Sequence, residues 1–199
     1  MILKERDFPL ILKKQQALLR RLSPQHKMYP IIMEDLKKRE AGFKGETSID
    51  YHLGFLDKDN YWILHDIRLS DQQNRFFQID TLIVTKTILI PIEIKNIAGT
   101  LYFDPIFKQL IRTKDGIESG FRYPLSQIEK QSSQLSAWLK RSNFPEVPIY
   151  PIIVISSPQT VIRTTSENRK IAQKVIHNEN LPEKIKELTS FHNLDILTE

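Results

Sequence analysis

Hydrophobic residues recur at helical spacing through the first quarter of the chain. Leucines and isoleucines at positions 9–23 are interleaved with basic pairs, which predicts an amphipathic helix. A second helical stretch is expected from about Ile31 to Arg39, and a third from about Phe43 to Phe55. Gly42 and Gly45 interrupt this part of the pattern, so the last two stretches form either separate helices or one bent helix.

The middle of the chain changes to short hydrophobic runs that are typical of β-strands. Segments 61–69, 76–84 and 88–95 are rich in β-branched and aromatic residues. A short turn at 85–87 predicts that the last two segments pair as antiparallel neighbours. A further short strand is expected at 100–103.

One long helix and one buried strand are predicted in the second half. Pro124 suits the first position of a helix over 124–141, whose apolar residues share one side. Residues 149–155 form a continuous apolar run, which is typical of a strand buried on both faces. The tail over 167–192 is expected to form one or two short helices around Leu181 and Pro182.

The order of these elements predicts the α/β fold class. The first three strands can form a meander, and the path through the long helix to the apolar strand becomes a right-handed parallel crossover. We therefore expect a mixed central β-sheet flanked by helices. The expected parts are a basic N-terminal helical extension (1–40), an α/β core (41–160) and a C-terminal helical tail packed on the core (161–199).

Composition is that of an ordinary globular protein. The 199 residues are 40% hydrophobic and 27% charged, which excludes a mostly disordered chain. No apolar run reaches about 18 residues, so no membrane span is expected, and the charges at 4–7 argue against a signal peptide. The absence of cysteine excludes a disulfide scaffold, a cysteine zinc site and a cysteine nucleophile; it suits a reducing cytoplasm.

Charge is unevenly distributed. Residues 1–45 carry eleven Lys/Arg against five Asp/Glu, a net +6, while the remaining residues carry 18 against 19. A basic extension on a near-neutral body favours a polyanionic partner such as nucleic acid or an anionic membrane surface. A solvated helix face is the alternative interpretation.

Candidate chemistry lies on the predicted strand pair. Along 88–95 the isoleucines share one face, and Glu93 and Lys95 lie on the other. If the turn is centred between residues 86 and 87, Asp80 lies opposite Glu93, and Gln78 lies opposite Lys95. Two carboxylates so close repel each other unless a cation bridges them, and Mg²⁺ prefers such oxygen ligands.

Two observations leave this interpretation open. An acidic residue two positions before a lysine occurs twice, at Asp35/Lys37 and Glu93/Lys95, which is about the number expected by chance. An ordinary Glu–Lys pair on an exposed sheet face is therefore the alternative. Pro91 cannot donate to a ladder, so a bulge or an unpaired position is expected there.

Other polar residues show weaker signals. Gln127, Gln131 and Gln134 form a stripe along the long helix, and the last two are expected at the surface. None of the five histidines shows metal-ligand spacing, and each is expected to be structural or exposed.

Four stretches resemble the nuclease-related domain (NERD) family of the PD-(D/E)XK nuclease superfamily. They occur in the family's order and are AGFKGE at 41–46, QIDTLIV at 78–84, PIEIKNIAGTLYF at 91–103 and YPLSQ at 123–127. The resemblance implies a restriction-endonuclease-like core with extra N- and C-terminal helices.

The resemblance also implies roles for individual residues. Asp80 matches the main metal ligand, and Glu93 matches the second ligand, with the Ile94 carbonyl as a further oxygen. Glu46 matches the acidic residue of the first core helix, which reaches the metal centre. Lys95 matches the lysine that positions water or offsets charge. The other matched or adjacent polar residues are the helix glutamine Gln127 and two possible substrate-binding residues, Gln78 and Asn96.

The predicted function is phosphodiester hydrolysis of nucleic acid that depends on Mg²⁺ or Mn²⁺, and the resemblance alone implies DNA as the substrate. The basic N-terminal helices would then contact phosphates, and such binding weakens with salt. The alternative is a non-catalytic module of the same fold that binds nucleic acid or another protein.

Overall fold

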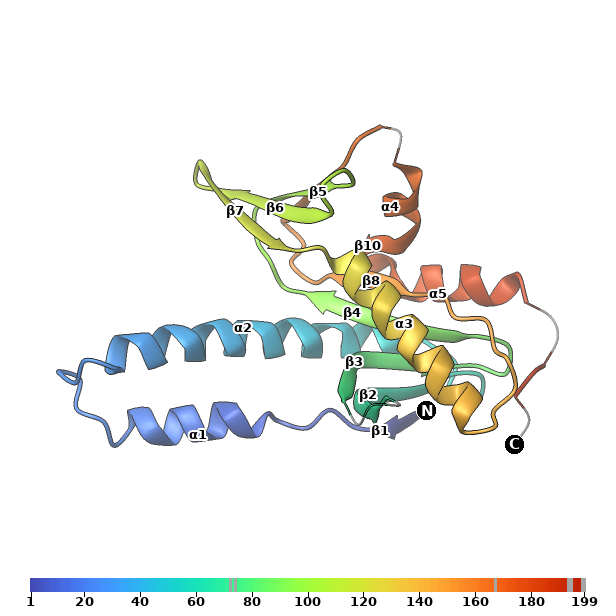
Figure 1. Ribbon diagram of the computed structural model, residues 1–199, viewed down its shortest axis with the longest axis horizontal. Coiled ribbons are helices and arrows are strands. Elements are labelled where there is room, and N and C mark those ends of the chain that lie inside the picture. Colours follow the sequence, from blue (N-terminus) through green and yellow to red (C-terminus); the bar gives the residue numbers. More distant parts are fainter. Residues whose placement is uncertain (72, 74, 167, 193–194, 198–199) are drawn as a thin grey trace.

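A six-stranded mixed sheet forms the centre of the molecule (Figure 1). The computed structural model describes residues 1–71, 73, 75–166, 168–192 and 195–197. The strand order is β1-β2-β3-β4-β8-β10, with β2, β3 and β4 antiparallel and β4, β8 and β10 parallel. The strands are β1 (Ile2–Lys4), β2 (Trp62–Ser70), β3 (Phe76–Val84), β4 (Leu89–Lys95), β8 (Ile152–Ile155) and β10 (Val175–His177).

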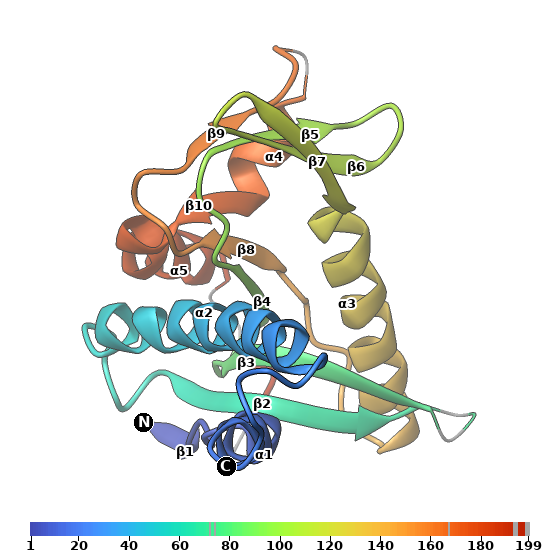
Figure 2. The ribbon, with the colours of Figure 1, turned by 90° about the vertical axis from the view of Figure 1, so that its left-hand side faces the viewer.

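Helices cover both faces of this sheet, which confirms the predicted fold class. The isoleucine face of β4 packs against α2 (Tyr29–Leu53) and α5 (Leu181–Ser190). The opposite face packs against α3 (Pro124–Arg141) through Leu82, Leu89 and Leu135. Figure 2 shows α2 and α5 on one side of β4 and β8, and α3 on the other. The remaining C-terminal elements are α4 (Arg169–Lys174) and a 3-10 turn, η1 (Asn178–Asn180).

The meander and the parallel crossover form as the alternation predicts. Strands β2, β3 and β4 pair as successive antiparallel neighbours, and α3 precedes β8, which lies parallel to β4. Of the predicted strand 149–155, only Ile152–Ile155 forms β8; these four residues are almost inaccessible because both sheet faces are covered, whereas 149–151 are half-buried.

A second sheet is formed by three strands inserted between β4 and α3 and by one strand that follows β8. It has the order β7-β6-β5-β9 and comprises β5 (Thr100–Asp104), β6 (Gln109–Lys114), β7 (Ile117–Arg122) and β9 (Val161–Arg163). The sequence predicts β5 alone. Strand β7 is mostly exposed and contains Gly120, so it lacks the hydrophobic alternation that reveals a half-buried strand.

The N-terminal helices form an arm that projects from the body (Figure 1). Helix α1 (Leu10–Leu19) packs on the first half of α2 through Leu12, Leu19 and Leu36. The stretches 31–39 and 43–55 belong to one continuous helix, so Gly42 and Gly45 do not divide them. The division expected at residue 40 falls within that helix.

The predicted strand register is confirmed from Thr81–Ile92 to Val84–Leu89, whereas the expected pairs Asp80–Glu93 and Gln78–Lys95 lie beyond the paired part of the two strands. The β3–β4 pairs include Leu82 with Pro91 and Thr81 with Ile92, whose residue numbers sum to the value expected for a turn centred between 86 and 87. No bulge forms at Pro91 toward β3, where it pairs with Leu82. The expected unpaired position is found on the other side, because pairing with β8 is interrupted between Leu89–Ile149 and Ile92–Ile152. Thr85 donates its N–H to the Ile88 carbonyl, and bonded pairs alternate along an antiparallel ladder. Pro91 therefore occupies a non-bonded pair, where no donor is needed on the β3 side.

Candidate functional site

Strands β3 and β4 part just beyond the pair Thr81–Ile92, and Asp80 fills the opening. A continued ladder would direct the Ile94 N–H to the carbonyl of residue 79. The Ile94 N–H instead donates to Asp80 Oδ2 at 3.0 Å. This bond holds the Asp80 carboxylate where the paired part of the two strands ends. Glu93 is the first residue of β4 beyond the last pair.

Glu93 is the buried partner of this acidic pair, with 3% of the residue exposed. Its Oε1 accepts from Lys95 Nζ in an ion pair, and its Oε2 accepts from Gln131 Nε2 at 3.1 Å. Lys95 Nζ also donates to Gln127 Oε1 at 3.3 Å. Because the Lys95 side chain is 24% exposed, its ammonium links the buried acid to the surface.

Gln131 is a site residue that the sequence places wrongly. The helical stripe predicts it at the surface, yet its amide bonds both Glu93 and the Gln78 carbonyl, the latter at 2.9 Å. The sequence feature that could have placed Gln131 at the site is its spacing of four residues from Gln127, because residues i and i+4 share one helix face. Gln78 contributes its backbone here, and its side chain is exposed.

Glu46 lies near this group but is held by another partner. Its Oε2 lies 3.5 Å from Arg6 Nη1, and its side chain is 30% exposed. Burial raises the pKa of Glu46, the Arg6 cation opposes that shift, and the charge of Glu93 adds to it. Within the described residues, no three His, Cys, Asp or Glu side chains converge on one point. Asp80 and Glu93 therefore form one acidic pair, and Glu46, which is paired with Arg6, lies beside it as a separate group.

Gly45 allows α2 to pass close to the ends of β4 and β8. A Cβ at this position would lie 2.8 Å from Ser156 Oγ and closer still to Asn96 Cβ. Asn96 donates its side-chain N–H to the Ala41 carbonyl at 2.7 Å, which ties the end of β4 to the helix. The close approach brings Glu46, the next residue of α2, toward the site.

Arg6 is a buried cation that the sequence does not reveal. Only 3% of its side chain is exposed, and its guanidinium lies within 3.4–3.7 Å of carboxylate oxygens of Glu46, Asp50 and Asp66. It also donates to the Asp80 carbonyl at 3.4 Å and contacts His65 Nδ1 at 2.9 Å. No local pattern marks Arg6, because these partners are at least 40 residues away.

The electrostatics of the site favour a cation. Burial, and then the charge of Glu93, raise the pKa of Asp80 to about 7, although the Ile94 N–H opposes the shift. Two carboxylates in a shared, poorly solvated space repel each other, and a bound cation relieves that repulsion. Asp80, Glu93 and the Ile94 carbonyl supply the oxygen donors that hard divalent cations prefer.

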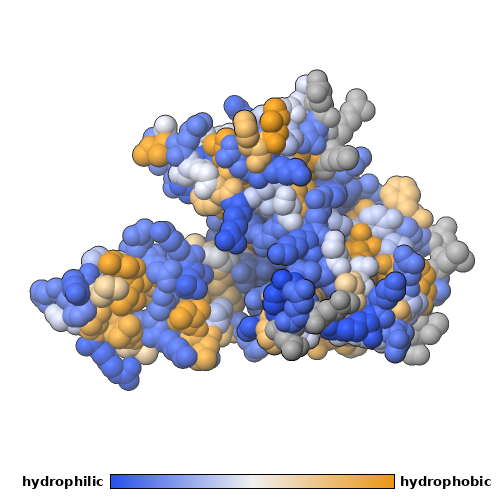
Figure 3. All heavy atoms as spheres, viewed as in Figure 1, coloured by the Kyte–Doolittle hydropathy of each residue, from blue (hydrophilic) through white to orange (hydrophobic). Residues whose placement is uncertain are grey.

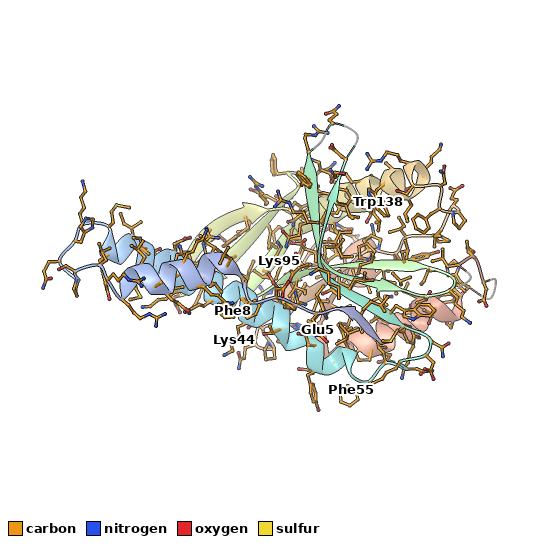
Figure 4. The ribbon with its side chains drawn as sticks, turned by 90° about the horizontal axis from the view of Figure 1, so that it is seen from below. Glu5, Phe8, Lys44, Phe55, Lys95 and Trp138 are labelled. Carbon is orange, nitrogen blue, oxygen red and sulfur yellow. The ribbon has the colours of Figure 1, made fainter. Side chains whose placement is uncertain are left out.

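The site opens into a notch between the arm and the small sheet. The C-terminal end of β4 points into this notch in Figure 1, and Figure 4 labels Lys95 where the arm, the small sheet and the main sheet meet. Hydrophilic side chains dominate the hollow in the space-filling view (Figure 3). A mixed sheet with helices on both faces, and with acids and a lysine where its central strands part, defines a nuclease-like α/β core.

Comparison with known proteins agrees with this class. Residues 41–156 match the nuclease-related domain (NERD) family, so the chain belongs to that family and to the PD-(D/E)XK-like nuclease superfamily. A curated protein of Bacillus anthracis, described only as uncharacterized, is 27% identical over 107 residues. The match covers 52% of this chain and 49% of that protein, so the chain spans about half the length of its relative.

No solved structure matches the chain. Among helices in the described ranges, none combines the length and apolar character needed to cross a membrane.

Proposed function

We propose that the protein is a metal-dependent phosphodiester hydrolase that cuts nucleic acid, with DNA as the substrate. The observation that carries this proposal is the Asp80 carboxylate inserted between the parting strands, beside buried Glu93 and close to Lys95. Membership of a nuclease-related family supports the class of reaction.

The donor set fits Mg²⁺ or Mn²⁺. Asp80, Glu93 and the Ile94 carbonyl would hold the ion, with Glu46 as a further carboxylate at its edge. When bound, a divalent ion lowers the pKa of a water and stabilises negative charge on phosphate oxygens. Burial, and then the charge of Glu93, raise the pKa of Asp80, and a bound cation would relieve the repulsion between the two carboxylates.

Lys95 acts as a fixed cation in this proposal. Its ammonium is held by Glu93 and by Gln127. At this place it attracts a phosphodiester and offsets the charge that grows on the phosphate during attack by water. Gln127 fixes the direction of the ammonium, and Gln131 fixes the Glu93 carboxylate.

The basic arm supplies further attraction for the substrate. Lysines and arginines within 1–45 give that part a net charge of +6, so phosphate contacts along the arm would weaken with added salt.

Cleavage of plasmid and labelled oligonucleotides with Mg²⁺ or Mn²⁺ tests the proposal. Asp80→Asn and Lys95→Met should abolish cutting while the fold is retained. Asp115→Asn is the matched control, because Asp115 lies in an exposed turn at φ 52°, which asparagine tolerates. Calorimetric titration with Mn²⁺ gives a second readout, since Asp80→Asn should also lose binding of the ion.

A wild-type protein that shifts DNA mobility but never cuts it, and that binds no divalent ion, would refute the enzymatic proposal. It would identify a non-catalytic binding module of the same fold.

A further inference from the structure

A broad groove of about 600 Å³ lies directly beside the candidate site. It runs between the start of β3, the β5–β6 turn and the exposed side of α3, elements that can be followed in Figure 2. Its volume lies within the range of typical ligand sites. Gln127 and Gln131 form part of its wall, and the same two side chains bond Lys95 and Glu93. The groove therefore leads to the acidic pair.

The groove is positively charged. Lys108, Arg122 and Lys130 line it from three different elements, and all three are exposed. Among the residues that the structure describes, no acidic side chain lines it. Within the same part of the chain, none of the three cations lies within 4.0 Å of a carboxylate oxygen. Three uncompensated cations in one concave surface favour a polyanionic ligand.

An exposed aromatic ring lines the same groove, and a second exposed ring is the neighbour in sequence of one of its lysines. Phe76 lines it and is 60% exposed, with the Arg68 guanidinium 4.5 Å from its ring centroid. Phe107 is 77% exposed and directly precedes Lys108. The turn that carries both is held by Asp104, which accepts N–H bonds from Ile106 and Phe107 at 2.9 and 3.2 Å. These hydrogen bonds thus hold the turn that carries the Phe107 ring and the Lys108 ammonium.

We propose that this groove binds a single-stranded segment of DNA and leads its phosphodiester to the acidic pair; the assignment rests on the proposed function. A basic track combined with exposed rings is the arrangement that binds single strands, because bases stack on the rings while cations follow the phosphates. A duplex keeps its base faces stacked and offers none to Phe76. Glu93 is also buried behind Gln131, where a flexible strand can bend and a stiff duplex cannot.

The test measures binding apart from cleavage. Fluorescence anisotropy with a labelled single strand, and with its duplex, is recorded in EDTA over a series of salt concentrations. The single strand should bind more tightly than the duplex. Each of Lys108→Gln, Arg122→Gln and Lys130→Gln should weaken binding and flatten the plot of log K against log salt by about 0.7 for each phosphate that the variant no longer neutralises.

Phe76→Leu separates stacking from charge. It should weaken single-strand binding about fivefold or more without changing the salt slope, since a stacked base contributes at least about a fivefold factor. Lys186→Gln is the matched control, because this exposed lysine lies on α5, on the opposite face of the main sheet. Its affinity and slope should equal those of the wild type.

Two outcomes overturn the inference: tighter binding of the duplex, or groove variants with wild-type affinity and slope. Failure of the proposed function gives a different result, in which the groove-dependent binding persists but no cleavage follows when Mg²⁺ is added. If the groove variants still cut DNA with an unchanged KM, the groove assignment is wrong and the nuclease proposal stands.

Discussion

Replacing Arg6 with methionine is expected to lower the free energy of unfolding by about 3 kcal/mol. Methionine keeps much of the buried hydrocarbon but removes the cation that faces Glu46, Asp50 and Asp66. Removing one partner from a buried ion pair costs about 3–5 kcal/mol. The three acids are 23–34% exposed, so water can solvate them after the change, which places the expected loss at the lower end.

Urea denaturation at neutral pH measures this loss, with an unchanged m-value as the sign that the unfolding reaction is the same. Arg6→Lys should recover part of the stability, because an ammonium restores the charge but lacks the fork that reaches several acceptors. Burial raises the pKa of Asp50 while Arg6 opposes that shift. The deficit of Arg6→Met should therefore shrink as the pH falls and the acids protonate. A loss below about 1 kcal/mol would show that the cation is not needed to balance these acids.

Three further predictions concern stability. Gly45→Ala should destabilise the protein by about 1–3 kcal/mol, because its Cβ would overlap Asn96 and Ser156. In Gly42→Ala, in the same helix, the added Cβ meets nothing within 4 Å, so this variant should instead be stabilised by up to about 1 kcal/mol. Similar shifts in the melting temperature of both variants would contradict the close approach at Gly45. Burial, and then the Arg6 cation, lower the pKa of His65 from 6.5 to about 4; the unfolded chain therefore binds more protons between these values, and stability should be fully present above pH 6.5 and fall by up to about 3 kcal/mol toward pH 4. The same pH series on His65→Gln should lose this part of the slope, and an unchanged slope would refute the assignment. Gln131→Leu should cost about 1.5–3 kcal/mol in urea, since buried Glu93 loses a charged hydrogen bond, while Gln134→Leu, one turn further along α3, should cost less; equal costs would remove Gln131 from the site.

The candidate site was predictable where it depends on local pattern. Alternation along β3 and β4 assigned Asp80 and Glu93 to one face, and the short turn between the strands fixed which residues are opposed. These features repeat every two residues, so a few neighbouring positions are enough to determine them. The same reasoning predicted an unpaired position at Pro91, and the structure shows on which side it falls: pairing continues toward β3 and is interrupted toward β8.

Features that join distant parts of the chain required the folded structure. The alternation of hydrophobic residues was enough to specify the meander, the crossover and the register of β3 against β4. Only the folded chain established that the strands part at Asp80, that Arg6 reaches Glu46 from 40 residues away and that Gln131 covers Glu93. Strand β7 of the second sheet escaped prediction because it is mostly exposed and buries too little surface to leave a pattern. Local periodicity records which side of an element is buried, whereas polar partners are chosen by the packing of elements that lie far apart in the sequence.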